Sequence, residues 1–361
     1  MYRMLVLIAC GAVMLACPHD FARTRDAAVD RTPGDTVADR AVDHRRHLRL
    51  RDGQVDTIGG PQVETVPVVL ATPRDVVLSA AGAIYTVNDA RLTTIVGTTV
   101  THVGTKDGSQ DGPLDQATFY SPEGLALDDK GQVFVADTYN NRIRLVSDNA
   151  VSTLAGSGVR GYLDGPAASA RFDYPVGVVV DPTGVVYVAD TGSSCIRRIA
   201  HGTVDTLAGA CGVHEFNDGA ARTALFYYPR GLALDRAGSL YIADQSNHRI
   251  RVLHKGRVTT FAGGVRGYLD SSTDHARFDH PGDVAVDDAG AVYVADTYNC
   301  TIRVIAGGAV TTLAGVAGIC GYRDGPALQA WFNYPYGVAV DAAGTVYVAD
   351  TSNNHIRIIR R

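Results

Sequence analysis

A phrase of 14 residues recurs five times in this chain, and no other feature restricts the fold so strongly. It reads VFVADTYNNRIRLV at 133–146 and VYVADTSNNHIRII at 346–359. The aspartates at its centre lie 52 to 54 residues apart, at Asp137, Asp190, Asp244, Asp296 and Asp350. A proline stands 15 residues before each of them, at Pro122, Pro175, Pro229, Pro281 and Pro335. A regular period of this size predicts a solenoid or a propeller.

Each unit contains four short runs of β-branched and aromatic residues that are separated by turn residues. In the first unit the runs are GLALD, VFVAD, RIRLV and VSTLAG, which predict a four-stranded antiparallel sheet. The turn after the first run begins at Asp128 and reaches Gly131, as a type I turn does. The second run is apolar on consecutive residues, which is typical of a strand covered on both faces. In a β-propeller the neighbouring blades supply that cover.

The ends of the repeat region predict how the ring closes. The segment TPRDVVLSAAGAIYTVND at 72–89 is an eroded sixth copy, and the last copy stops after three runs. The missing run matches the start of the chain, because QVDTIGG at 54–60 is similar to TVDTLAG at 203–209. We therefore predict an all-β fold, a six-bladed β-propeller of four-stranded blades. In it, residues 54–59 form the outermost strand beside residues 355–360 and so remove an exposed sheet edge.

The segments YIADQSNHRIRV and GLALDRAGSLYIADQ, with Asn247 and His248, resemble NHL repeats over residues 54–361. This resemblance implies a six-bladed propeller and leaves function open, since one propeller fold serves many activities. Some NHL propellers bind RNA through a basic face. Here Lys and Arg number 33 against 38 Asp and Glu, and phosphate binding depends on basic residues. We therefore expect no nucleic-acid partner.

The N-terminal residues predict export. The stretch from Met4 to Ala16 is apolar and too short to span a membrane, so residues 1–17 are interpreted as a signal peptide. Its end, MLAC, resembles a bacterial lipobox with Cys17 as the lipidated residue; plain secretion or an uncleaved leader are the alternatives. Residues 18–46 are polar and predict a flexible tether, and residues 47–361 form the propeller. The expected location is the bacterial cell envelope, with membrane contact only through the lipid anchor.

Four cysteines follow the leader. Cys195 and Cys300 fall in the turn after the second run of their units, and Cys211 and Cys320 fall just past the fourth run. In an antiparallel meander these two loops lie on the same face. We therefore predict the disulfides Cys195–Cys211 and Cys300–Cys320, each stabilising the fold by roughly 2–4 kcal/mol. A metal site is the alternative, but the close CxxC spacing of such sites is missing.

Residues present in every unit are interpreted as structural. We expect the central aspartate to cap the following turn, and the arginine seven residues later, such as Arg144, to pair with an acidic group. We expect the phenylalanines of the long connections to fill the grooves between blades; they are Phe119, Phe172, Phe226, Phe278 and Phe332. His248 and His355 are interpreted as turn residues.

The residues directly after the repeated proline differ between units and lie where the innermost strands enter the central channel. They include Arg74, Asp75, Glu123, Arg230, Asp283 and Tyr336. Such a ring suits a polar or zwitterionic ligand or a peptide end; the alternative is that the charges neutralise each other and bind only water. Calcium held by Asp75, Glu123 and Asp283 is a further hypothesis. No other cofactor is expected.

No catalytic residue is nominated, because the chain shows no nucleophile elbow, phosphate loop or HExxH pattern. The favoured function is a monomeric, non-enzymatic module that binds a protein, a peptide or a small polar ligand. The alternative is a propeller enzyme, a metal-assisted lyase or lactone hydrolase, because some six-bladed relatives hold a metal around the channel. Here only His280 lies near the channel mouth, so a three-histidine zinc site is not expected. A purely structural scaffold is the third hypothesis.

Overall fold

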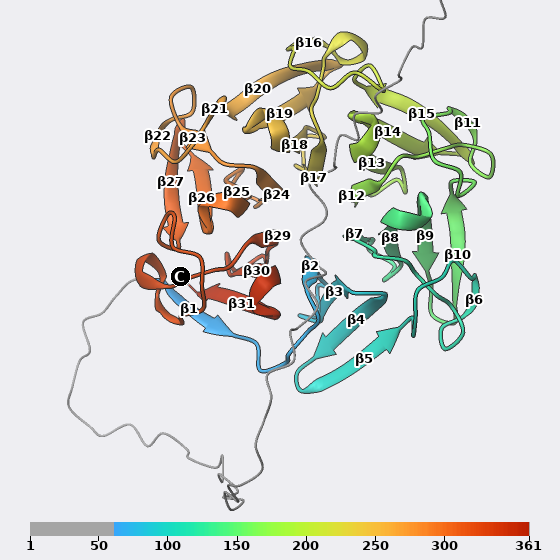
Figure 1. Ribbon diagram of the computed structural model, residues 1–361, viewed down its shortest axis with the longest axis horizontal. Coiled ribbons are helices and arrows are strands. Elements are labelled where there is room, and N and C mark those ends of the chain that lie inside the picture. Colours follow the sequence, from blue (N-terminus) through green and yellow to red (C-terminus); the bar gives the residue numbers. More distant parts are fainter. Residues whose placement is uncertain (1–60, 361) are drawn as a thin grey trace, which may run out of the picture. The chain divides into compact units, whose positions relative to one another are not determined.

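The computed structural model describes residues 61–360, in which six β-sheets surround a central axis (Figure 1). Blade 1 contains β2 (Pro73–Leu78), β3 (Ile84–Asn88), β4 (Arg91–Val96) and β5 (Thr99–Val103). Blade 2 contains β7 (Gly124–Leu127), β8 (Val133–Asp137), β9 (Arg142–Val146) and β10 (Ala150–Ala155). Blade 3 contains β12 (Pro175–Val180), β13 (Val186–Asp190), β14 (Cys195–Ala200) and β15 (Thr203–Ala208).

The second half of the ring repeats this order. Blade 4 contains β17 (Pro229–Leu234), β18 (Leu240–Asp244), β19 (Arg249–His254) and β20 (Arg257–Gly263). Blade 5 contains β24 (Pro281–Val286), β25 (Val292–Asp296), β26 (Thr301–Ala306) and β27 (Ala309–Ala314). Blade 6 contains β29 (Pro335–Val340), β30 (Val346–Asp350), β31 (His355–Arg360) and, from the other end of the chain, β1 (Gln62–Thr65). The six-bladed propeller is confirmed. Within residues 61–360, no helix is long and apolar enough to cross a membrane.

The ring closes through an N-terminal strand, as predicted, but the segment predicted for it was wrong. Gln62–Thr65 pairs with β31, with Val63 opposite Ile359, and residues 54–59 lie outside the described residues. The chain contains two similar stretches, QVDT and QVET, eight residues apart. The second is followed by a connection whose Val66 and Leu70 donate backbone hydrogen bonds to the blade 6 backbone. The same connection leads directly into β2, and a strand sequence alone does not reveal this continuity.

Each long connection adds a fifth strand that the sequence did not predict. Before entering the inner strand of its blade, the connection runs to the outer edge and pairs there over two residues. These strands are β6 (Gly112–Pro113), β11 (Gly165–Pro166), β16 (Gly219–Ala220), β22 (Ser271–Ser272) and β28 (Gly325–Pro326). In blade 5 the connection also forms β21 (Val265–Arg266) and β23 (Arg277–Phe278), which pair in parallel. Covering the outer strand leaves little exposed sheet edge.

Short 3-10 helices follow the second strands of blades 2 to 6. They span Thr138–Asn140, Thr191–Ser193, Gln245–Asn247, Thr297–Asn299 and Thr351–Asn353, and two more, Ala221–Thr223 and Ala327–Gln329, lie in the long connections. The central aspartates precede the first five of these helices without making a side-chain cap, so the prediction of a capping role was wrong.

Instead, each central aspartate forms a buried ion pair. Asp137 Oδ2 lies 2.6 Å from Arg144 Nη1, and Oδ1 accepts a hydrogen bond from the backbone N–H of Tyr120. The other side of the guanidinium binds Asp111, which precedes the fifth strand and also accepts a bond from the N–H of Thr153. One arginine therefore fastens the long connection to the blade, and the predicted arginine–acid pairing is confirmed. The same set recurs around Arg197, Arg251, Arg303 and Arg357.

Packing between blades and the two disulfides follow the sequence predictions. Phe172 is fully buried and packs with residues of blades 2 and 3, including Phe134 and Val178. Cys195–Cys211 and Cys300–Cys320 are both bonded, with sequence separations of 16 and 20 residues. Each disulfide joins the start of the third strand, at Cys195 or directly before it at Cys300, to the segment beyond the fourth strand.

Candidate functional site at the channel mouth

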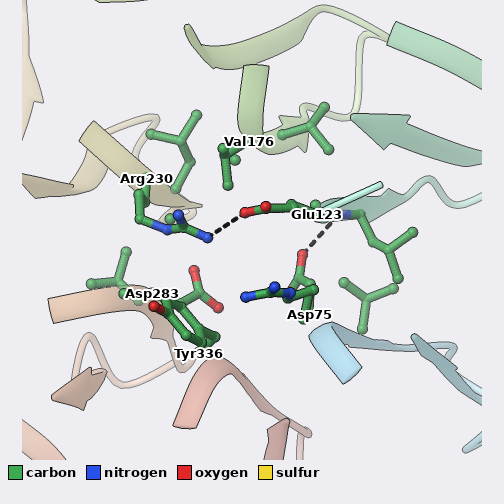
Figure 2. A pocket seen from close by; sticks show the side chains of 16 residues that line it. Asp75, Glu123, Val176, Arg230, Asp283 and Tyr336 are labelled. Carbon is green, nitrogen blue, oxygen red and sulfur yellow. Dashed lines mark hydrogen bonds and ion pairs between the residues drawn. The ribbon is translucent and has the colours of Figure 1, made fainter. Parts of the chain in front are cut away.

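The innermost strands approach one another so closely at the channel mouth that most blades need glycine there. A Cβ atom at Gly124 would lie 1.9 Å from the carbonyl oxygen of Val176, and one at Gly177 would lie 2.0 Å from that of Arg230. These are steric overlaps, so the second residue after the proline is restricted by the neighbouring blade. Blades 1 and 5 carry aspartate at this position, and their side chains point into the channel region (Figure 2).

The two aspartates bridge neighbouring blades. Asp75 accepts the N–H of Leu125 in blade 2 at 2.7 Å, and Asp283 accepts the N–H of Val338 in blade 6 at 2.9 Å. Burial raises the pKa of Asp75 to about 7. Burial, and then repulsion from Asp75, raises the pKa of Asp283 well above its usual range. Near neutral pH this pair therefore holds protons that ordinary aspartates have lost.

Arg230 lies at the mouth in blade 4, next to Asp283 of blade 5 and across from Asp75 of blade 1 (Figure 2). Its Nη2 lies 2.6 Å from Glu123 Oε2, and the two side chains are 4% and 5% exposed. The guanidinium lies over the ring of Tyr336 at 4.9 Å, and Arg74 approaches the same ring at 5.4 Å. Because both members of the pair are buried, removing either one alone leaves an uncompensated charge.

All six side chains singled out in the sequence line one cavity of about 70 Å³ (Figure 2). The remaining lining is glycine and aliphatic residues such as Val176 and Leu232. The convergence of these residues is a finding, whereas their role in binding a ligand stays a prediction. The cavity admits a small polar group rather than a whole drug-sized molecule, since pockets for such ligands have several hundred Å³.

Among residues 61–360, Asp75, Glu123 and Asp283 do not bring three donor atoms close enough to share one cation. The group that does so is His248, Asp279 and His280, whose ligand atoms lie within 4.8 Å of one another. The ligand atoms of these three residues already interact with one another. His280 Nδ1 lies 2.6 Å from Asp279 Oδ1, and His248 Nδ1 accepts the backbone N–H of His280. Arg266 also pairs with Asp279, so the group acts as a polar link between blades 4 and 5.

Sequence reasoning missed the aromatic surroundings of the mouth. The residue before each inner-strand proline has a positive φ, and in blades 3 to 6 it is Tyr174, Tyr228, His280 or Tyr334. Neighbouring rings contact one another, as in Tyr139–Tyr174 at 5.2 Å and His280–Tyr298 at 4.4 Å. The signal was present in the repeated FDYP, FYYP, FDHP and FNYP segments. These rings place a half-exposed aromatic margin beside the polar cavity.

Comparison with known proteins identifies the repeat. The model of the NHL repeat matches residues 119–144, 172–199, 226–253, 278–305 and 332–359. The chain is 31% identical over 277 residues to the chloroplastic protein SUPPRESSOR OF QUENCHING 1 of Arabidopsis thaliana, covering 70% of this chain and 26% of that protein. It is 30% identical over 298 residues to human NHL repeat-containing protein 2, covering 71% of this chain and 41% of that protein. The chain thus spans less than half the length of these relatives.

Solved structures agree on the fold. An auxiliary nutrient binding protein from Bacteroides thetaiotaomicron superposes with a TM-score of 0.61 and 16% identity, over 81% of this chain and 69% of that one. A streptogramin B lyase superposes with a TM-score of 0.52 and 11% identity, over 83% of this chain and 97% of that one. At such identities the likeness concerns architecture alone. The five matched repeats, set in a closed ring of six blades, place this chain in the family of NHL-repeat β-propellers.

Proposed function

We propose that this protein is an exported, non-enzymatic binding module whose ligand is a small polar molecule or a peptide end seated at the channel mouth. The observation that supports it best is the single cavity where Arg74, Asp75, Glu123, Arg230, Asp283 and Tyr336 meet. These residues belong to different blades and depart from the repeat pattern. Structural positions repeat in this chain, so blade-specific residues in one cavity are the best candidates for recognition.

The topology supports a tethered arrangement. β1 runs antiparallel to β31, so Gln62 lies beside Arg360, at the end of the ring opposite the channel mouth. The first strand of the described ring therefore begins at the end away from the mouth. In this proposal Cys17 carries the lipid and residues 18–46 form the tether. The ring is closed and fifth strands cover the outer edges of blades 2 to 6, which fits a monomer.

The nutrient-binding protein that shares this fold supports a binding role only by analogy. The two disulfides support export more directly, because disulfides persist in oxidising compartments.

A ligand screen by thermal shift tests the proposal. The parent protein would be compared with the double variant Glu123→Gln/Arg230→Gln, in which both charges of the buried pair are removed together. Arg236→Gln is the matched control, because Arg236 lies in the same blade, is 78% exposed and pairs with Asp288. We expect compounds that raise the melting temperature of the parent and of the control to lose their effect on the double variant. Ligands that stabilise all three proteins equally would place the site elsewhere.

One observation favours an enzyme as the second candidate. Asp279 Oδ1 lies 2.6 Å from Nδ1 of His280, and this contact orients Nε2 of the ring as a candidate proton acceptor at the margin of the mouth. A lyase or lactone hydrolase would need such a base. Turnover of a lactone or peptide substrate that His280→Gln abolishes would favour this candidate over the binding module.

A further inference from the structure

The chemistry of the cavity narrows the ligand class beyond "polar". Six buried side chains among residues 61–360 have a nitrogen or oxygen atom without a hydrogen-bond partner, and Arg230 Nε is the one that belongs to a residue lining the channel cavity. The guanidinium of Arg230 already has one partner, because its Nη2 donates a hydrogen bond to Glu123. An unpartnered donor on a fully buried guanidinium is costly. It calls for an acceptor atom in the cavity.

The acid pair, of which Asp283 lies next to Arg230 and Asp75 lies across from it, also acts as a donor (Figure 2). Asp75 accepts a backbone N–H on each carboxylate oxygen, from Val76 and from Leu125 of the next blade, and Asp283 accepts the N–H of Val338 in the next blade. Their raised pKa values keep protons on the pair near neutral pH, and a protonated carboxyl donates through its O–H. Arg230 interacts electrostatically with both aspartates, and Arg74, Glu123 and Tyr336 are the other charged or titratable groups that line the cavity. The cavity thus offers donors from two sides.

Size and charge restrict the acceptor further. A volume of about 70 Å³ gives room for roughly five atoms of the size of water. Glu123 already balances the charge of Arg230, so Arg74 is the lining cation that can balance a ligand, and it matches a single negative charge better than a dianion such as hydrogen phosphate. A carboxylate accepts charge-assisted hydrogen bonds from guanidinium well and fits this space.

We infer that the channel mouth binds one carboxylate group, from a small monocarboxylic acid or from the end of a longer ligand such as a peptide, and takes up a proton with it. This inference rests on the proposed function and specifies its ligand. The carboxylate accepts from Arg230 Nε and from the protonated acid pair. The rest of a longer ligand lies against the tyrosines and His280 at the margin of the mouth. Binding then weakens as the pH rises, because the acid pair must be protonated.

Titration of the full chain with matched probes, followed by NMR, tests the inference. The probes are acetate, its neutral analogue acetamide and the cation methylammonium. N-acetyldiglycine and its C-terminal amide distinguish a free small acid from a peptide end. We expect acetate or N-acetyldiglycine to bind and the amides and the cation not to bind. Above pH 7 the affinity should fall about tenfold per pH unit, as uptake of one proton requires.

Two variants and one control distinguish the contribution of Arg230 from that of the acid pair. Glu123→Gln/Arg230→Gln should abolish carboxylate binding, while Arg236→Gln should retain it. Asp283→Asn keeps an acceptor for the Val338 N–H and removes one titrating group, so it should flatten the pH dependence. Stronger binding of methylammonium or acetamide, or acetate affinity that does not change between pH 6 and pH 8, would overturn the inference. If a neutral or cationic ligand binds at the mouth, the proposed binding function survives while this inference fails; if no ligand depends on the mouth, both fail.

Discussion

Arg144 is fully buried, yet two carboxylates and two backbone carbonyls hold its guanidinium. Nη1 binds Asp137 and the carbonyl of Thr118, and Nη2 binds Asp111 and the carbonyl of Gln110. Blade 1 has an uncharged pair at the equivalent positions, in which Thr93 Oγ1 donates a hydrogen bond to Asn88 Oδ1 at 2.6 Å. The two residues of the pair changed together, as expected when a lone buried charge is costly.

Blade 1 therefore provides a natural template for a test in blade 2. Arg144→Thr alone should destabilise the protein by about 3–5 kcal/mol, since Asp137 is left buried without its partner. Adding Asp137→Asn should recover part of this loss, because it recreates the neutral pair of blade 1. Urea unfolding of the parent, both single variants and the double variant gives the coupling energy. A double variant less stable than the sum of the single variants would contradict the interpretation.

The acid pair predicts how stability depends on pH. A carboxyl whose pKa rises on folding, as for Asp75 from 3.8 to about 7, favours the native state at low pH. That contribution is fully present below about pH 4 and is lost as the pH rises through about 7. Asp75→Asn removes it, so the stability of the variant relative to the parent should improve between pH 5 and pH 8 by on the order of 2–4 kcal/mol. Asp129→Asn is the control at an exposed position, and thermal melts at both pH values are the measurement; an equal difference at both would contradict the buried titration.

At the scale of the elements, the repeated pattern predicted the four main strands of each blade because their apolar period and turn residues are local signals. The fifth strands were missed, since Gly112–Pro113 and its counterparts pair over only two residues, and in three of the five a glycine followed by a proline indicates a turn. The closing strand was placed one near-copy too early for a related reason. QVDT and QVET satisfy the same strand pattern, and only the path to β2 distinguishes them.

The closing strand can be tested at a single position. Val63 is 2% exposed and faces Ile359 in the core of blade 6. Val63→Asp places an unpaired charge there and should destabilise the protein by on the order of 3–5 kcal/mol. Val55→Asp, in the segment that the sequence pattern favoured, should leave the melting temperature unchanged. The reverse result would restore the original prediction for the closing strand.

At the scale of the whole molecule, the sequence located the candidate site because a repeat protein separates structural from specific residues. Contact between blades explains why the second residue after each proline is glycine in most blades. Asp75 and Asp283 are the exceptions, and they are recognised only when the six copies are compared. The cavity's size, the protons on the acid pair and the unpartnered Arg230 nitrogen could not be predicted. They depend on distances between blades that are far apart in the sequence, such as Glu123 and Arg230.

The proposed lipid anchor leads to a prediction for the intact protein. If Cys17 bears a lipid, its removal changes no residue of the channel mouth, and the first strand of the ring begins at Gln62, at the end away from the mouth. Cys17→Ala should move the protein from the membrane fraction to the soluble fraction of the expressing cells. The released protein should keep its melting temperature and its ligand affinity, because no residue of the ring has changed. Fractionation followed by immunoblotting measures the first outcome, and thermal shift with a mouth ligand measures the second. Retention of the variant in the membrane fraction would refute the lipid anchor, and a loss of affinity on release would show that the mouth depends on the membrane.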